Sequence, residues 1–379
     1  MNALLNTYSR FPVEFVEGKG SKLFDKNGRE YLDLLSGIAV TGFGHRHKEI
    51  TKAAEEQINK LWHVSNLFES SPQQELAGKL VESSGLDSVF FCNSGTEANE
   101  AAIKFARKWG GNKKKIISTY GSFHGRTMGS LSATGKESLW KGFSPMLEEF
   151  SFAEYNNIES IKNIIDENTC AIMVEPVQGE NGVIIPEEGY LVKLRQLCDE
   201  NNLLLILDEV QTGIGRTGKI FAYQWENIKP DLVTLAKGIA NGLPLGAVVC
   251  SKEISGIIEP GDHGSTFGGN PVSVAAANKV FDLLNAETLD DIIYKGNLIK
   301  TKLNEIESPL IISIRGKGLM IAIEFNKPVS KELIPRLLKQ GVVVGGAGES
   351  IIRLYPSFLI TEGEISNFIE IIKKVINEF

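Results

Sequence analysis

Residues 203–237, LLLILDEVQTGIGRTGKIFAYQWENIKPDLVTLAK, decide the fold of this chain. The stretch opens with five large aliphatic residues, 203–207, and such a continuous apolar run predicts a strand buried on both faces of a parallel sheet. This run ends at Asp208, and a second apolar run, 232–236, ends at Lys237. Because ligands bind at the carboxyl ends of strands in open parallel sheets, we expect the acid and the amine to meet at one site.

Each of these two charges also has an ordinary structural explanation. An aspartate at the end of a strand often caps the following helix, and a lysine after a strand often extends into water. Considered together, an acid and an amine at neighbouring strand ends indicate a cofactor that has a basic nitrogen and a carbonyl group. Both explanations stay open on this stretch alone.

Composition narrows the possible classes of protein. A length of 379 residues exceeds one ordinary core, so two domains are expected, and 42% hydrophobic residues with 38 glycines fit an α/β enzyme. The net charge of −7 argues against nucleic-acid binding. The four cysteines lack metal-ligand spacing, and His45, His47 and His63 have no nearby cysteine or acidic cluster at ligand spacing. Neither a signal pattern nor a membrane-spanning run is found. We therefore expect a cytoplasmic protein with free thiols and no metal.

The middle of the chain alternates apolar runs with helical segments. A strand, a turn and a helix are expected over 89–110, and further helices near 50–61, 72–81 and 189–200. Strands are also expected at 115–119, 171–174 and 246–250, besides the two in the opening stretch. This alternation predicts an α/β fold with a mostly parallel, doubly wound sheet.

The last third of the chain has a different pattern. After an alanine-rich helix at 272–284, helices alternate with short strands at 311–314, 319–325, 342–344 and 351–354. We expect the strands that flank the Asn27-Gly28 turn to join this α+β module. The predicted division is a large cofactor-binding domain, 41–270, and a small discontinuous domain formed by 1–40 and 271–379.

Asn93-Ser94-Gly95-Thr96-Glu97 lies between a predicted strand and a predicted helix. The spacing of Ser94 and Glu97 matches a capping box, which is a structural explanation. The free N–H groups of a helix start, together with the hydroxyls of Ser94 and Thr96, also suit a phosphate group. The two explanations are compatible.

A nucleotide-binding loop is an alternative for the glycine-rich segment. Residues 213–219 match G-x-x-x-x-G-K, and the acidic strand before them resembles that of P-loop NTPases. The next residue is Ile220, which lacks the hydroxyl that binds magnesium, and the glycines follow the acidic strand directly instead of occupying a strand-to-helix turn of their own. This alternative is therefore disfavoured.

Taken together, these features and several further motifs resemble class III pyridoxal-phosphate aminotransferases, and within them the acetylornithine group. The resemblance covers nearly the whole chain, and the one departure is at Ala240-Asn241, where the family more often has another glycine. The motifs that carry it are NTYSRFP (6–12), NSGTEANEAA (93–102), SFHGRT (122–127), VEPVQGE (174–180), DEVQTGIGRTG (208–218), HGSTFGGNP (263–271) and RLYPSFLIT (353–361).

The resemblance implies pyridoxal phosphate fold type I and assigns roles to the residues that match. Lys237 would hold the cofactor covalently and move protons, and Asp208 would face its ring nitrogen; these are the expected catalytic residues. Because the family is a homodimer with shared sites, Thr266 would reach the phosphate of the second subunit, although an ordinary turn hydroxyl is the alternative for this residue. The implied cofactor contacts are Ser94, Gly95, Thr96, Phe123, Asp208, Glu209, Val210, Gln211, Lys237 and Thr266.

The resemblance also implies a substrate site. Arg126, with Ser265 nearby, would bind the carboxylate of the ornithine-type substrate, and Arg353 would bind the α-carboxylate of glutamate, since a planar guanidinium suits a carboxylate. Glu180 would pair with Arg353 when the other substrate is present; a structural salt bridge is the alternative for Arg353. The implied activity is transfer of the δ-amino group of N-acetylornithine to 2-oxoglutarate, a step of arginine biosynthesis. Another ω-aminotransferase acting on succinylornithine, ornithine, acetyl-lysine or 4-aminobutyrate, an aminomutase, and a non-enzymatic binding protein are the alternatives.

Overall fold

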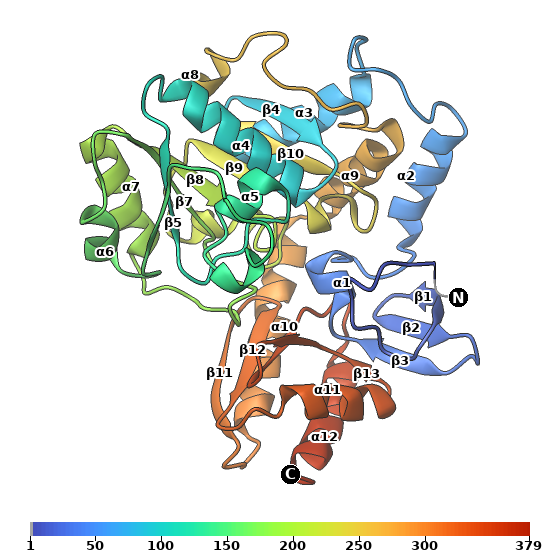
Figure 1. Ribbon diagram of the computed structural model, residues 1–379. Helices are drawn as coiled ribbons and strands as arrows, with labels where there is room; N and C mark the ends of the chain where they lie inside the picture. Colours follow the sequence, from blue (N-terminus) through green and yellow to red (C-terminus); the bar gives the residue numbers. More distant parts are fainter. Residues whose placement is uncertain (1–2) are drawn as a thin grey trace.

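The computed structural model describes residues 3–379, and a seven-stranded sheet is its largest element (Figure 1). Neighbouring strands run parallel except at β10, which is antiparallel to both of its neighbours. The predicted α/β fold with a mostly parallel sheet is confirmed. In spatial order the strands are β4 (Ser88–Cys92), β10 (Gly246–Cys250), β9 (Leu232–Leu235), β8 (Leu204–Asp208), β7 (Thr169–Val174), β5 (Lys115–Thr119) and β6 (Phe150–Ala153).

Helices cover both faces of this sheet, and β8 shows how its residues divide between them. Leu204 and Ile206 pack in the core formed with α4 (Gly95–Trp109). Leu205 and Leu207 pack in the core formed with α3 (Ser71–Ser84) and α7 (Tyr190–Asn201). Since successive side chains of a strand point to opposite faces, Asp208 at the end of β8 falls on the α4 side.

Helix α9 (Pro271–Leu283) lies with the large sheet. It packs against α2 (Lys48–Ile58) and α3. The next helix, α10 (Ala286–Asn304), instead packs against β11 (Ile311–Lys317) and α12 (Glu362–Ile376). The packing partners therefore change between α9 and α10.

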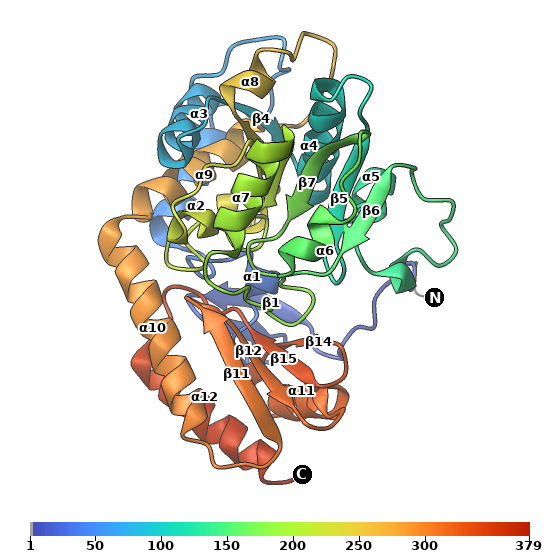
Figure 2. The same ribbon diagram turned by 90° about the vertical axis from the view of Figure 1, so that its left-hand side faces the viewer.

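Two four-stranded sheets lie below the large sheet in the views of Figures 1 and 2. The first joins both ends of the chain, because β13 runs parallel to β3. Met1 and Asn2, which the predicted small domain includes, lie outside the described residues. The first sheet contains β1 (Phe15–Lys19), β2 (Lys22–Asp25), β3 (Glu30–Asp33) and β13 (Val342–Val343); the second contains β11, β12 (Met320–Phe325), β15 (Ile351–Leu354) and β14 (Gly345–Ala347), with α11 (Ser330–Lys339) nearby.

Short elements complete the architecture. The apolar pattern does not predict β6 and β14, which are only four and three residues long. From residue 3 to residue 379, no helix is long and apolar enough to cross a bilayer. The remaining elements are α1 (Ser36–Ala39), α5 (Met128–Ser132), α6 (Ile158–Lys162), α8 (Lys252–Ser255) and the 3-10 helices η1 (Glu137–Leu139), η2 (Ala222–Trp225) and η3 (Lys237–Ala240).

Candidate active site

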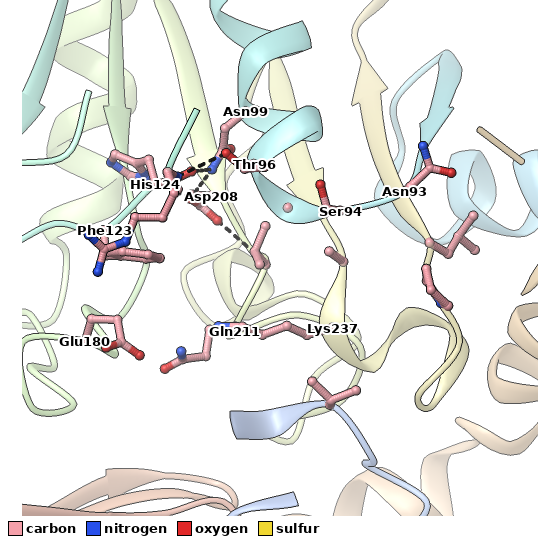
Figure 3. A pocket seen from close by; sticks show the side chains of 18 of the residues that line it. Asn93, Ser94, Thr96, Asn99, Phe123, His124, Glu180, Asp208, Gln211 and Lys237 are labelled. Carbon is pink, nitrogen blue, oxygen red and sulfur yellow. Dashed lines mark hydrogen bonds and ion pairs between the residues drawn. The ribbon is translucent and has the colours of Figure 1, made fainter. Parts of the chain in front are cut away.

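A cavity of about 430 Å³ opens where β8 and β9 end, and Asp208 and Lys237 both line it (Figure 3). Two apolar runs thus deliver an acid and an amine to one place, as the parallel sheet predicts. The predicted site residues that line the cavity are Ser94, Gly95, Thr96, Phe123, Arg126, Glu180, Asp208, Val210, Gln211 and Lys237.

The carboxylate of Asp208 is buried within a hydrogen-bonded group (Figure 3). Nδ2 of Asn99, on α4, donates to Oδ2 of Asp208 over 2.8 Å, and Nδ1 of His124 lies 2.7 Å from the same oxygen. The amide of Val210 donates to Oδ1 over 3.0 Å. Asn99 also donates to the main-chain oxygen of His124 over 2.6 Å. These bonds fix the orientation of the carboxylate toward the cavity.

Lys237 follows β9 in an unfavourable backbone conformation. Its φ of 47° lies in the left-handed region that residues other than glycine rarely adopt, and such strain is concentrated at functional sites. Burial lowers the pKa of Lys237, and the carboxylates of Glu180 and Asp208 oppose this effect without cancelling it. The neutral, nucleophilic amine is therefore more populated than for a lysine in water.

Helix α4 begins at the cavity. Oγ of Ser94 accepts a hydrogen bond from the amide of Glu97 over 3.3 Å, as the capping spacing predicts. The carboxylate of Glu97 reaches back to the amide of Asn93 over 2.8 Å, one residue before the position that a capping box predicts. Throughout the described part of the chain, the amides of Gly95 and Thr96 have no acceptor. These free donors at a helix N-terminus suit an anion.

Phe123 and Val210 form apolar walls of the cavity. The guanidinium carbon of Arg126 lies 5.6 Å from the centre of the Phe123 ring, and Arg126 is exposed. Val210 packs against the start of α4 so closely that a Cβ at Gly95 would lie 2.7 Å from its Cγ1. Gln211 is oriented by the hydroxyl of Tyr355, which donates to its Oε1 over 2.8 Å. Only glycine at position 95 therefore allows Val210 to pack this closely against the start of α4.

Arg353, on β15, does not line the cavity itself but pairs with Glu180, which does. Its Nη1 donates to Oε1 of Glu180 over 2.7 Å and to the main-chain oxygen of Gly179 over 3.0 Å. Arg353 is only 4% exposed. Burial raises the pKa of Glu180, but Arg353, together with Lys237 and Lys136, outweighs burial, so the net pKa is lowered and Glu180 stays ionised at neutral pH.

Besides Arg353, three expected contacts do not line the cavity within one chain. Glu209 follows Asp208 and points to the other face of the sheet, where its carboxylate binds the hydroxyl of Thr212 and the amide of Tyr223. The carboxylate of Glu209 therefore does not line the cavity, as strand alternation explains, and a cofactor contact of this residue stays a prediction. Oγ of Ser265 accepts a hydrogen bond from Nδ2 of Asn93 over 3.1 Å, and Thr266 is exposed.

The structure also places unpredicted polar residues at the cavity. Asn99 and His124 bind Asp208, although both lie inside motifs that the sequence resemblance already contains. Glu175 is buried, and its Oε2 has no hydrogen-bond partner among residues 3–379. Burial, and secondly the charge of Asp208, raise the pKa of Glu175 well above its ordinary value. The sequence signal for Glu175 is its position as a polar residue directly after a predicted strand.

The model of the family "Aminotransferase class-III" matches residues 5–376. The chain belongs to the class III aminotransferases. Acetylornithine aminotransferase of Aquifex aeolicus is 44% identical over 381 residues, which cover 99% of this chain and 100% of that protein. The enzyme of the same name from Bacillus anthracis is 46% identical over 376 residues, which cover 98% and 97%.

Solved structures lead to the same family. Ornithine aminotransferase from Toxoplasma gondii, with partial occupancy of pyridoxal phosphate at its active site, superposes on this class III aminotransferase with a TM-score of 0.95. The two sequences are 31% identical, and the match covers 100% of this chain and 92% of the other. The predicted family and enzyme class are confirmed.

The residues of the cavity fit pyridoxal phosphate. Free amides at the start of α4 match its phosphate, and the ring of Phe123 offers an aromatic face. The oriented carboxylate of Asp208 matches a protonated ring nitrogen, and the amine of Lys237, with its lowered pKa, matches the aldehyde. The donor set therefore agrees with the cofactor that the family resemblance implies.

Proposed function

We propose that this class III aminotransferase transfers the δ-amino group of N-acetylornithine to 2-oxoglutarate, yielding N-acetylglutamate 5-semialdehyde and glutamate in arginine biosynthesis. Its cofactor is pyridoxal phosphate. The observation that carries the proposal is the Glu180–Arg353 ion pair at the edge of the cavity that holds Asp208 and Lys237. Glu180 can leave Arg353 when a substrate carries a carboxylate on the reacting carbon and can pair with it when the substrate does not. Such a site suits two substrates that differ in this carboxylate.

The chain's own residues supply binding and proton transfer. Pyridoxal phosphate, when bound, supplies an aldehyde and an electron-withdrawing ring. Lys237 would take the proton from the amino-bearing carbon of the donor and, in the second half-reaction, deliver a proton to the carbon that becomes C2 of glutamate, a role that its lowered pKa supports. Asp208 keeps the ring nitrogen protonated, because a fixed carboxylate favours the cationic form. The start of α4 holds the phosphate through the amides of Gly95 and Thr96 and the side chain of Ser94.

Two arginines are proposed to bind the carboxylates of the two substrates. N-acetylornithine carries one carboxylate, and Arg126, exposed at the mouth of the cavity, is the residue proposed to bind it. Glutamate carries a second carboxylate on the reacting carbon, and Arg353 is the residue proposed to bind that group. Glu180 pairs with Arg353 whenever the reacting carbon of the substrate carries no carboxylate.

The identity of the amino donor is supported by sequence more than by shape. The relatives at 44–46% identity over nearly the full chain are acetylornithine aminotransferases. Ornithine, succinylornithine, acetyl-lysine and 4-aminobutyrate remain the competing substrates. The Glu180–Arg353 pair argues against an aminomutase, because an aminomutase has no need of a glutamate site.

The proposal extends to the assembly and location of the protein. We propose a homodimer with shared sites, in which Ser265 and Thr266 serve the second subunit, because both lie outside the cavity of their own chain. The loop that carries them also holds Phe267, which is 61% exposed. We keep the division into a large and a small domain as a proposal, and a cytoplasmic location is supported by four free, buried cysteines.

A labelled amino group tests the function directly. The purified holoenzyme is incubated with 2-oxoglutarate and N-acetylornithine that carries ¹⁵N at the δ position, and glutamate is examined by mass spectrometry. We expect ¹⁵N-glutamate from the wild type and none from Lys237→Ala. Labelled glutamate from Lys237→Ala, or none from a wild type with bound cofactor, would contradict the proposal.

A further inference from the structure

Lys136 lies against the residue that pairs with Arg353. It precedes η1, and its Nζ donates to the main-chain oxygen of Glu180 over 2.8 Å. The side chain is half-buried, and within residues 3–379 it forms no ion pair with a carboxylate. A desolvated ammonium group therefore rests beside Glu180 without a counter-ion of its own.

Glu180 loses its ion-pair partner when Arg353 binds a substrate carboxylate. The side chain of Glu180 is 29% exposed, and its Oε1 accepts a hydrogen bond from Nη1 of Arg353 over 2.7 Å. When the α-carboxylate of glutamate takes Arg353, Glu180 loses this partner. A half-buried carboxylate without a partner is unfavourable, so it needs either water or another cation.

Few cations are available to Glu180. Besides Arg353, the charges that oppose the effect of burial on the pKa of Glu180 are those of Lys237 and Lys136. Lys237 has to be free for the reacting carbon. Burial lowers the pKa of Lys136, while Glu180 and then Glu175 oppose this effect, so a closer carboxylate would also stabilise the charged lysine.

We propose that Lys136 is the alternative counter-ion of Glu180, receiving its carboxylate when a dicarboxylate substrate occupies Arg353. Lys136 is thus a positioning residue for the half-reaction with glutamate or 2-oxoglutarate. The inference rests on the proposed function, and it adds a residue to the substrate switch.

The two half-reactions then depend on Lys136 to different extents. The δ-carbon of N-acetylornithine carries no carboxylate, so the Glu180–Arg353 pair remains closed and Lys136 keeps only its main-chain contact. Glutamate opens the pair and requires the alternative partner. A general structural role for Lys136 would affect both half-reactions equally.

Single-turnover spectroscopy of the holoenzyme tests this difference. Lys136→Met removes the charge at similar length, Lys136→Arg retains a cation, and Lys141→Met is the matched control on an exposed lysine nearby. We expect Lys136→Met to slow the glutamate half-reaction roughly tenfold or more and to leave the N-acetylornithine half-reaction within about twofold. Lys136→Arg should recover most of the loss, and Lys141→Met should match the wild type.

A binding measurement provides a readout apart from turnover. The affinity of the holoenzyme for glutarate, an unreactive dicarboxylate, should fall in Lys136→Met by about the same factor as the glutamate half-reaction. Equal losses in both half-reactions, no loss in either, or unchanged glutarate binding would overturn the role of Lys136. A wild type that reacts with glutamate but not with N-acetylornithine would instead refute the proposed function and leave the glutamate and glutarate tests of Lys136 intact.

Discussion

Nδ1 of His124 lies 2.7 Å from Oδ2 of Asp208, and both side chains are buried. Asn99 binds the same oxygen from α4, so the loop after β5 and the helix after β4 both hold an acid at the end of β8. The geometry of Asp208 is therefore set by two segments of the chain besides its own strand. This arrangement makes His124 and Asn99 positioning residues for the proposed contact with the ring nitrogen.

His124→Ala should lower kcat/KM roughly tenfold, because it removes one of two side-chain partners of Asp208. His124→Asn is the matched variant, since an asparagine amide can occupy the place of Nδ1 and donate to Asp208. Steady-state rates and the dissociation constant of pyridoxal phosphate check this. Equal rates for His124→Ala and the wild type would show that His124 has no part in orienting Asp208.

Asp208→Asn tests the charge without changing the shape. We expect kcat to fall by more than about a hundredfold, or about 3 kcal/mol of activation free energy, because the ring nitrogen loses the carboxylate that keeps it protonated. The measurement is kcat with the cofactor at saturation, and bound cofactor in the variant is confirmed by its visible absorption. A rate within a few-fold of the wild type would refute this role.

Arg126→Ala should impair the two half-reactions unequally. N-acetylornithine has one carboxylate and depends on Arg126, whereas glutamate keeps its contact with Arg353. We expect a loss of roughly a hundredfold in the N-acetylornithine half-reaction and a smaller loss with glutamate. Single-turnover rates check the prediction, with Arg126→Lys as the variant that keeps the charge. Equal losses would mean that Arg126 does not discriminate between the substrates.

Glu209→Gln should change the pH dependence of stability. Burial raises the pKa of Glu209 from 4.5 to about 7, so the folded state holds a proton that the unfolded state releases between these values. Stability contributed by this proton is present at low pH and is lost as pH rises through that window. The Tm measured by thermal unfolding should therefore decline less steeply from about pH 5 to about pH 8 in Glu209→Gln than in the wild type. Parallel curves would contradict the raised pKa.

The central residues of the site could be predicted from the sequence because local patterns encode their positions. Asp208 and Lys237 end apolar runs, and the edge of a parallel sheet brings such ends together. The family motifs supplied Phe123, Arg126 and Glu180, all of which line the cavity.

Other features depend on contacts that spacing does not contain. The bond of Asn99 to Asp208 joins residues 109 positions apart and requires the crossing of α4 over the sheet. Glu209 turns away because alternation along β8 sends it to the face opposite Asp208. The placement of α9 likewise follows from its packing on α2, which no local pattern specifies.

Substrate preference is the central claim, and kcat/KM for a panel of amino donors with 2-oxoglutarate tests it most directly. The panel contains N-acetylornithine, succinylornithine, ornithine, acetyl-lysine and 4-aminobutyrate, and Lys237→Ala provides the blank. We predict the highest kcat/KM for N-acetylornithine. A higher value for any other donor, or no turnover of N-acetylornithine by holoenzyme that reacts with glutamate, would contradict the account.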